Sequence, residues 1–147
     1  MTVFSLLGLA VEELVAWRPD LIVHDDPSEI QVADTSAYVS HPDGEFEVVC
    51  NTQGLADTVF VFRQSSLLNG MIGFGKSRKD ILAQLGVPKA SGEESIDKYL
   101  GAQGAWGRFD YSDWSVHFQY RFESDHLEKL TVMTREAAES LSQSATG

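Results

Sequence analysis

The segment GMIGFGKS, from Gly70 to Ser77, has residue types and spacing that could bind a nucleotide. A glycine, four intervening residues and then Gly75, Lys76 and Ser77 form the pattern of a phosphate-binding P-loop. In such a loop the backbone N–H groups hold the phosphates, the lysine contacts the terminal phosphates, and the hydroxyl group binds Mg²⁺. The spacing alone therefore raises the hypothesis of a small nucleotide-binding enzyme.

The residues around this loop do not fit that hypothesis. A P-loop directly follows a buried parallel strand, but Arg63–Asn69 separates Gly70 from the nearest strand-like run, TVFVF. Large side chains occupy the loop at Met71, Ile72 and Phe74, where the backbone must approach phosphate closely. We therefore interpret the match as accidental, and we expect the chain to have no cofactor and no catalytic residues.

The end of the segment is typical of a helix N-terminus. Ser77 and Asp80 form a capping-box pattern, in which each side chain accepts a hydrogen bond from the other residue's backbone N–H. Apolar residues recur at helical spacing as far as Leu85, and then Gly86 and Pro88 end the pattern. The sequence therefore predicts a short helix over 77–85.

Histidines with nearby carboxylates are the other groups that could do chemistry. His24 stands beside Asp25 and Asp26, but the sequence near them offers no second cluster that would complete a metal site. A second group lies in one predicted hairpin region and comprises His117, His126, Asp110, Asp113 and Asp125. Because no nucleophile or substrate pocket can be placed beside them, we interpret both groups as surface charges without a bound metal. For His117, a contact or pH-sensitive role at a binding surface is favoured over catalysis.

Composition and charge restrict the class of partner. The 147 residues include 11 basic and 22 acidic side chains, which give a formal net charge of −11 and a pI near 4.6. An acidic field repels nucleic-acid phosphates and anionic lipid surfaces, and it speeds encounter with basic proteins. No apolar run approaches the roughly 20 residues that a membrane-spanning helix needs. We therefore expect a protein partner with a basic surface, and neither nucleic acid nor membrane.

The cysteine content and the N-terminus indicate a cytoplasmic protein. Cys50 is the only cysteine and lies in the apolar run FEVVC, which predicts a buried, reduced thiol. The N-terminal run MTVFSLLGLAVEELVAW lacks the basic start and the small-residue cleavage site of a signal peptide. An apolar fraction of 43% is sufficient for the core of one ordinary domain.

The order of the predicted elements indicates an internal duplication. In the first half, a short helix and three strand-like runs follow one another at 9–17, 36–40, 45–51 and 57–62. In the second half, the same order recurs at 77–85, 106–111, 114–122 and 127–133. The sequence therefore predicts one compact domain over 1–133, made of two pseudo-repeats at about 5–63 and 72–133.

Alternation within the strands predicts how the elements are layered. In WSVHFQYRF, apolar side chains from Trp114 to Phe122 alternate with polar ones. One apolar and one polar face is typical of an antiparallel sheet that helices cover on one side. We expect an α+β fold in which two helix–strand–strand–strand repeats form such a sheet, covered on one face by short helices. Residues 134–147 are predicted to be a C-terminal tail, either a frayed helix or disordered.

Several segments resemble those of small bacterial immunity proteins, which are encoded beside secreted polymorphic toxins. They are GFGKSRKDILAQLGVPKASG, GRFDY, WSVHFQY and LEKLTVM. The tandem arrangement of a helix and an antiparallel hairpin is also similar to the fold of β-lactamase-inhibitor protein and outer-membrane-assembly lipoprotein domains. The likeness extends from Leu6 to Met133 and lies in the pattern of elements. It implies a stoichiometric inhibitor or binding module without catalysis.

The leading interpretation is an immunity-type inhibitor that binds a cognate toxin domain and occludes its active or substrate-binding surface. Exposed Trp and Tyr beside carboxylates are good interface anchors, so we expect contact through the polar sheet face and adjoining loops. The predicted partner-binding residues are Glu45, Glu47, Glu93, Glu94, Asp110, Tyr111, Asp113, Trp114, His117 and Gln119. Two alternatives remain open: a nucleotide-binding or hydrolytic enzyme that uses Gly70–Ser77, and a small-ligand-binding domain.

Overall fold

The structure is a computed structural model that describes residues 1–28, 30, 34–68, 73–99 and 101–146, with side chains as far as residue 140. Its helices are α1 (Val3–Leu6), α2 (Val11–Trp17), the short 3-10 helix η1 (Ser66–Leu68), α3 (Arg78–Leu85) and α4 (Arg135–Thr146). Its strands are β1 (Ile22–His24), β2 (Thr35–Ser40), β3 (Phe46–Asn51), β4 (Ala56–Val61), β5 (Ala90–Gly92), β6 (Ser95–Asp97), β7 (Gly101–Gln103), β8 (Trp106–Asp110), β9 (Trp114–Tyr120) and β10 (Leu127–Thr134). These elements confirm the predicted mixture of helices and strands.

The main sheet has eight strands in the order β1-β2-β3-β4-β10-β9-β8-β5, and each neighbouring pair is antiparallel. Strands β6 and β7 pair with each other in a separate two-stranded sheet. At the centre, β4 from the first half of the chain lies beside β10 from the second half, with Val59 opposite Val132. The antiparallel sheet predicted from the strand alternation is therefore confirmed.

One face of the main sheet forms the hydrophobic core. A row of buried apolar side chains crosses this face from strand to strand and comprises Val48, Val59, Val132, Val116 and Phe109. The period of two in β3 and β9 sets such side chains on the same face. Each of them contributes roughly 1.5–3 kcal/mol on leaving water, which makes this face the main source of stability.

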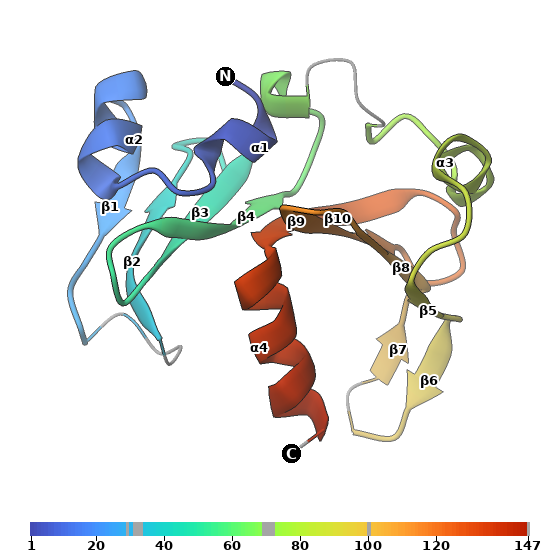
Figure 1. The fold of residues 1–147 in the computed structure, drawn as a ribbon. Coiled ribbons are helices and arrows are strands. Elements are labelled where there is room, and N and C mark those ends of the chain that lie inside the picture. Colours follow the sequence, from blue (N-terminus) through green and yellow to red (C-terminus); the bar gives the residue numbers. More distant parts are fainter. Residues whose placement is uncertain (29, 31–33, 69–72, 100, 147) are drawn as a thin grey trace.

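Helices α1, α2 and α3 lie on the core face (Figure 1). Their buried side chains are Val3 and Leu6 from α1, Leu14 from α2 and Ile81 from α3. Helices of four to eight residues are unstable in isolation, so this packing is what stabilises them. The ring of Trp17, at the end of α2, also stacks on Phe46 of β3 with centroids 6.1 Å apart.

Helix α4 lies on the opposite side of the sheet, where it contacts β9 and β10 and buries Ala138 (Figure 1). The prediction that helices cover one face only is therefore wrong, whereas 134–147 was predicted to be either a frayed helix or a disordered tail. Its Ala137 and Ala138 allow close packing without the wide stripe of large apolar residues by which a core helix is recognised. No helix in the described part of the chain is long and apolar enough to cross a membrane.

Four strands, β1, β5, β6 and β7, were not predicted from the sequence. Each contains three residues, which is too short for a period of two to be seen. Strands β6 and β7 form a hairpin that projects from the sheet on the same side as α4 (Figure 1). The second half of the chain thus carries an exposed element between α3 and β8 for which no strand was predicted.

Candidate functional site

The sheet face opposite α1, α2 and α3, here called the second face, carries a continuous band of partly exposed side chains. We define the second-face band as Glu47, Phe60, Lys129, His117, Gln119 and Trp106. Strand register brings them together, because Glu47 pairs with Phe60, and Gln119 pairs with both Lys129 and Trp106. The band therefore crosses five neighbouring strands, from β3 to β8.

Ring contacts hold the band in place. The indole of Trp106 stacks on the imidazole of His117, with ring centroids 5.3 Å apart and planes 22° from parallel. On the other side, the Lys129 ammonium group lies 5.2 Å from the centre of the Phe60 ring, in cation–π geometry. The ring of Phe62 stacks on Phe60 and is 42% exposed. The band therefore presents preorganised aromatic side chains with few rotamers left to lose on binding.

In this band, the surroundings of His117 shift the pKa of its side chain. Its pKa is lowered from 6.5 to about 4, mainly by burial and in addition by the nearby positive charges of Lys129 and Arg108. At neutral pH the ring is therefore uncharged and acts as an aromatic contact surface. The sequence-based idea of a pH-sensitive contact at this position does not extend to the neutral range.

Asp110, the last residue of β8 before the β8–β9 turn, is engaged inside the molecule. Its carboxylate lies 3.2 Å from Arg108 Nε and 3.8 Å from Arg135 Nη1, and it accepts a 2.7 Å hydrogen bond from the Ser115 hydroxyl. Arg135 also donates a 3.1 Å hydrogen bond to the carbonyl oxygen of Tyr111. These contacts tie the turn to the start of α4, so Asp110 has a structural role whatever its part in binding.

The other predicted residues of this turn lie in different surroundings. Tyr111 is 41% exposed, and Asp113 is exposed. Trp114 instead lies on the core face, where it stacks on Phe4 of α1 with ring centroids 4.3 Å apart. Trp114 is therefore a packing residue between β9 and α1, and the turn offers Tyr111 and Asp113 as the more accessible side chains.

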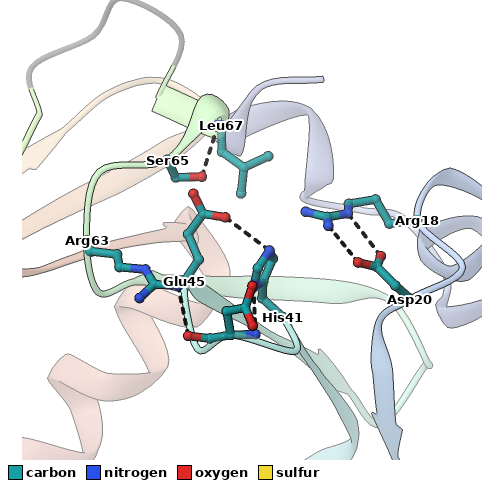
Figure 2. A network of polar contacts seen from close by, with 8 residues as sticks. Arg18, Asp20, His41, Glu45, Arg63, Ser65 and Leu67 are labelled. Carbon is teal, nitrogen blue, oxygen red and sulfur yellow. Dashed lines mark hydrogen bonds and ion pairs between the residues drawn. The ribbon is translucent and has the colours of Figure 1, made fainter.

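Glu45 is separated from Glu47 and belongs to a polar network at the β2–β3 turn (Figure 2). Its Oε2 lies 3.1 Å from Nε2 of His41, whose Nδ1 accepts a 3.0 Å hydrogen bond from the N–H of Asp43. Because Nδ1 accepts, the proton of a neutral His41 must reside on Nε2 and point to Glu45. Arg63 also donates a 2.9 Å hydrogen bond to the Asp43 carbonyl oxygen. Through its contact with His41, Glu45 therefore helps to hold this turn in place.

Glu93 and Glu94 stand at the start of the β6–β7 hairpin and have partners within the chain. The Glu93 carboxylate accepts hydrogen bonds of 3.0 and 2.9 Å from the guanidinium of Arg78, which lower the pKa of Glu93. Glu94 accepts a 2.7 Å hydrogen bond from the N–H of Glu123. Both carboxylates thus attach the hairpin to the rest of the second half.

The P-loop-like segment lies partly outside the described residues, since Gly70, Met71 and Ile72 fall there. The described part has the geometry of a capped helix start: Ser77 Oγ accepts from the N–H of Asp80, and the Asp80 carboxylate accepts from the N–H of Ser77. Among described elements, the 3-10 helix η1 separates this segment from β4. Among the described residues, the element before this segment is therefore a 3-10 helix and not the strand from which a P-loop begins.

Neither histidine–carboxylate group forms a metal site in the described residues, where no cluster of three or more His, Cys, Asp or Glu is suitably placed. His24 stacks on Tyr38 with ring centroids 4.2 Å apart, and Asp26 accepts hydrogen bonds from Ser28.

Cys50 is buried, as predicted, and burial raises the pKa of its thiol to about 11. Such a thiol is protonated and unreactive at neutral pH.

The band contains three residues predicted from the sequence, Glu47, His117 and Gln119, and three that were missed. Phe60, Lys129 and Trp106 were not among the predicted partner-binding residues. A signal for Phe60 was present, because alternation in DTVFVF sets it on the face opposite Val59 and Val61. The sequence does not show which strands adjoin β4, so the neighbours of Phe60 could not be predicted.

Comparison with known proteins shows a shared fold. No protein-family model and no curated protein matches the sequence. Among solved structures, an extracellular protein containing an SCP domain from Bacillus anthracis str. Ames is similar, with a TM-score of 0.62 and 13% sequence identity. The match covers 93% of this chain and 47% of that protein, so the chain spans about half its length. At this identity the likeness concerns the fold alone.

Proposed function

We propose that this protein is an immunity-type inhibitor, which neutralises a cognate bacterial toxin domain by covering its active or substrate-binding surface. The observation that carries the proposal is the second-face band, in which Phe60 and Trp106 stay partly exposed on a regular sheet. Partly exposed aromatic side chains flanked by polar groups are typical of protein contact surfaces. Glu47, Gln119 and Lys129 supply the polar groups here.

The charge of the chain supports a basic partner. A net charge of −11 would attract a positively charged toxin surface over distances of about a Debye length and would speed the encounter. Such steering raises the association rate more than the affinity, so the aromatic side chains of the band are the proposed source of tight binding. Its place of action is proposed to be the cytoplasm, where the toxin would reach its substrate.

We also propose that the two halves, about 5–63 and 72–133, are repeats of one ancestral unit. The support is the order of the sheet, in which β4 and β10 lie at the centre and the pairs β3 and β9, β2 and β8, and β1 and β5 follow outward. Helices α2 and α3 precede the strands of their own halves. Under this proposal the second-face band spans the junction between the two units.

Co-expression with the product of the gene immediately upstream tests the proposed inhibitor. Growth of cells that express that product should be restored by the wild-type protein and poorly restored by the Phe60→Ala variant. Loss of an interface anchor weakens binding by roughly tenfold or more. The matched control is Leu55→Ala, which removes a 37% exposed side chain at the β3–β4 turn, outside the band. If Phe60→Ala restored growth as well as wild type, the second-face band would not be the binding surface.

A further inference from the structure

The β6–β7 hairpin combines a fixed base with an exposed tip. Ile96, in the middle of β6, is 78% exposed, and Tyr99, in the turn, is 87% exposed. Among the large apolar side chains that the structure describes, only Val87 is more exposed. All three residues of β6 are exposed, and β6 and β7 pair only with each other in the described residues. An isolated two-stranded hairpin is marginally stable by itself, so the rest of the molecule must hold it.

Hydrogen bonds attach the first strand of the hairpin to two separate elements. Glu93, just before β6, forms two hydrogen bonds with Arg78 at the start of α3. Glu94 accepts a hydrogen bond from the N–H of Glu123 in the β9–β10 turn. The strand therefore leaves the body of the molecule in a defined direction.

Two glycines flank the hairpin and allow other parts of the chain to pack closely against its base. A Cβ atom on Gly92 would lie 2.3 Å from Nε1 of Trp106, and a Cβ atom on Gly104 would lie 1.7 Å from the carbonyl oxygen of Tyr120. Neither position has the positive φ that by itself would favour glycine, so close packing explains these residues. Gly92 of β5, which leads into the hairpin, is thus packed directly against Trp106, at the end of the second-face band.

We propose that the β6–β7 hairpin is a docking arm that inserts Ile96 and Tyr99 into a cleft of the partner protein. This inference rests on the proposed inhibitor function and names a second contact element for the same partner. The arm projects on the side of the second face (Figure 1), so the arm and the band can contact one protein together. Large apolar side chains on a hairpin whose base is held in place lose little conformational entropy on insertion.

The proposed partner is a protein with a cleft that is apolar inside and basic at its rim. Glu93, Glu94 and Asp97 flank the exposed apolar residues, and Lys98 is the single basic residue between Glu93 and Tyr99. The acidic excess complements a basic rim, as it does for the chain as a whole. Lys98 itself lies 5.7 Å from the centre of the Tyr99 ring, which orients this ring at the tip.

The test compares calorimetric dissociation constants for the purified toxin domain encoded immediately upstream. The double variant Ile96→Ser with Tyr99→Ser should bind about thirtyfold more weakly or worse, because each is a candidate anchor of an interface. The control Val87→Ser removes a 93% exposed apolar side chain outside the hairpin and should leave the dissociation constant unchanged. Equal melting temperatures for all proteins would show that the fold is intact.

The outcomes separate this inference from the proposed function. Wild-type affinity in the double variant, together with weakened binding by Phe60→Ala, would overturn the docking arm and leave the inhibitor in place. No binding by the wild-type protein would overturn both. A wild-type dimer that the double variant dissociates, seen by analytical ultracentrifugation, would reassign the hairpin to self-association and also overturn the inference.

Discussion

Protonation of His117 should destabilise the folded protein in a defined pH window. The pKa of this ring is about 4 in the folded state, because the ring is largely buried within the band and faces the positive charges of Lys129 and Arg108. In the unfolded chain the pKa returns to about 6.5. Above pH 6.5 the ring is neutral in both states and the contribution to stability is complete. Between pH 6.5 and pH 4 the unfolded chain binds a proton that the folded protein does not, so stability falls.

The size of the effect follows from the two pKa values. Each unit of pKa difference corresponds to about 1.36 kcal/mol, so a shift from 6.5 to about 4 costs about 3 kcal/mol at pH 4. This is a large part of the 5–15 kcal/mol that typically separates folded from unfolded states. For a domain of this size it corresponds to a change in melting temperature of roughly 6–12 °C.

The assay is urea unfolding of wild type and His117→Gln at several pH values from 7 to 4. Titration of the carboxylates affects both proteins, so the difference between the two free energies of unfolding isolates His117. That difference should move in favour of His117→Gln by about 3 kcal/mol as the pH falls to 4. The control Gln119→Asn alters the band without removing a titratable group, and its curve should run parallel to wild type. A constant difference between His117→Gln and wild type would refute the argument from burial.

Two further predictions concern backbone packing and capping. Gly104→Ala should lower the free energy of unfolding by about 3 kcal/mol, because its Cβ would lie 1.7 Å from the Tyr120 carbonyl oxygen. The control Gly75→Ala places its Cβ where no atom lies within 4 Å, so it should be neutral or stabilise by up to about 1 kcal/mol. Chemical denaturation of both variants checks this, and equal stabilities would contradict the close approach. Ser77→Ala removes the acceptor for the Asp80 N–H and should cost about 1 kcal/mol in the same assay, with no loss contradicting the cap.

The parts of the fold that were predictable depend on local signals. The alternation around Phe46 and Phe118 sets which side chains face the core, and this needs no knowledge of neighbouring strands. The start of α3 was predictable for the same reason, since Ser77 and Asp80 interact across three residues. Boundaries moved by one or two residues, as for β9, which ends at Tyr120 and not at Phe122.

The parts that were not predictable depend on contacts distant in sequence. The second-face band requires β4 to lie beside β10, and the sequence does not say which strands adjoin across the two halves. Glu45 was expected beside Glu47 on the sheet, but His41 holds its side chain at the turn. Trp114 was expected as a partner anchor, but α1 supplies Phe4 to stack on it, and a four-residue helix gives no periodic signal.

The most direct test of the account is a titration of toxin activity with the purified protein at a toxin concentration far above the dissociation constant. A stoichiometric inhibitor reduces the activity linearly and reaches its end point at one equivalent, and light scattering should then give the mass of a one-to-one complex. Inactivation at a small fraction of an equivalent would mean that the protein acts catalytically. Undiminished activity at excess protein would contradict the proposed inhibition altogether.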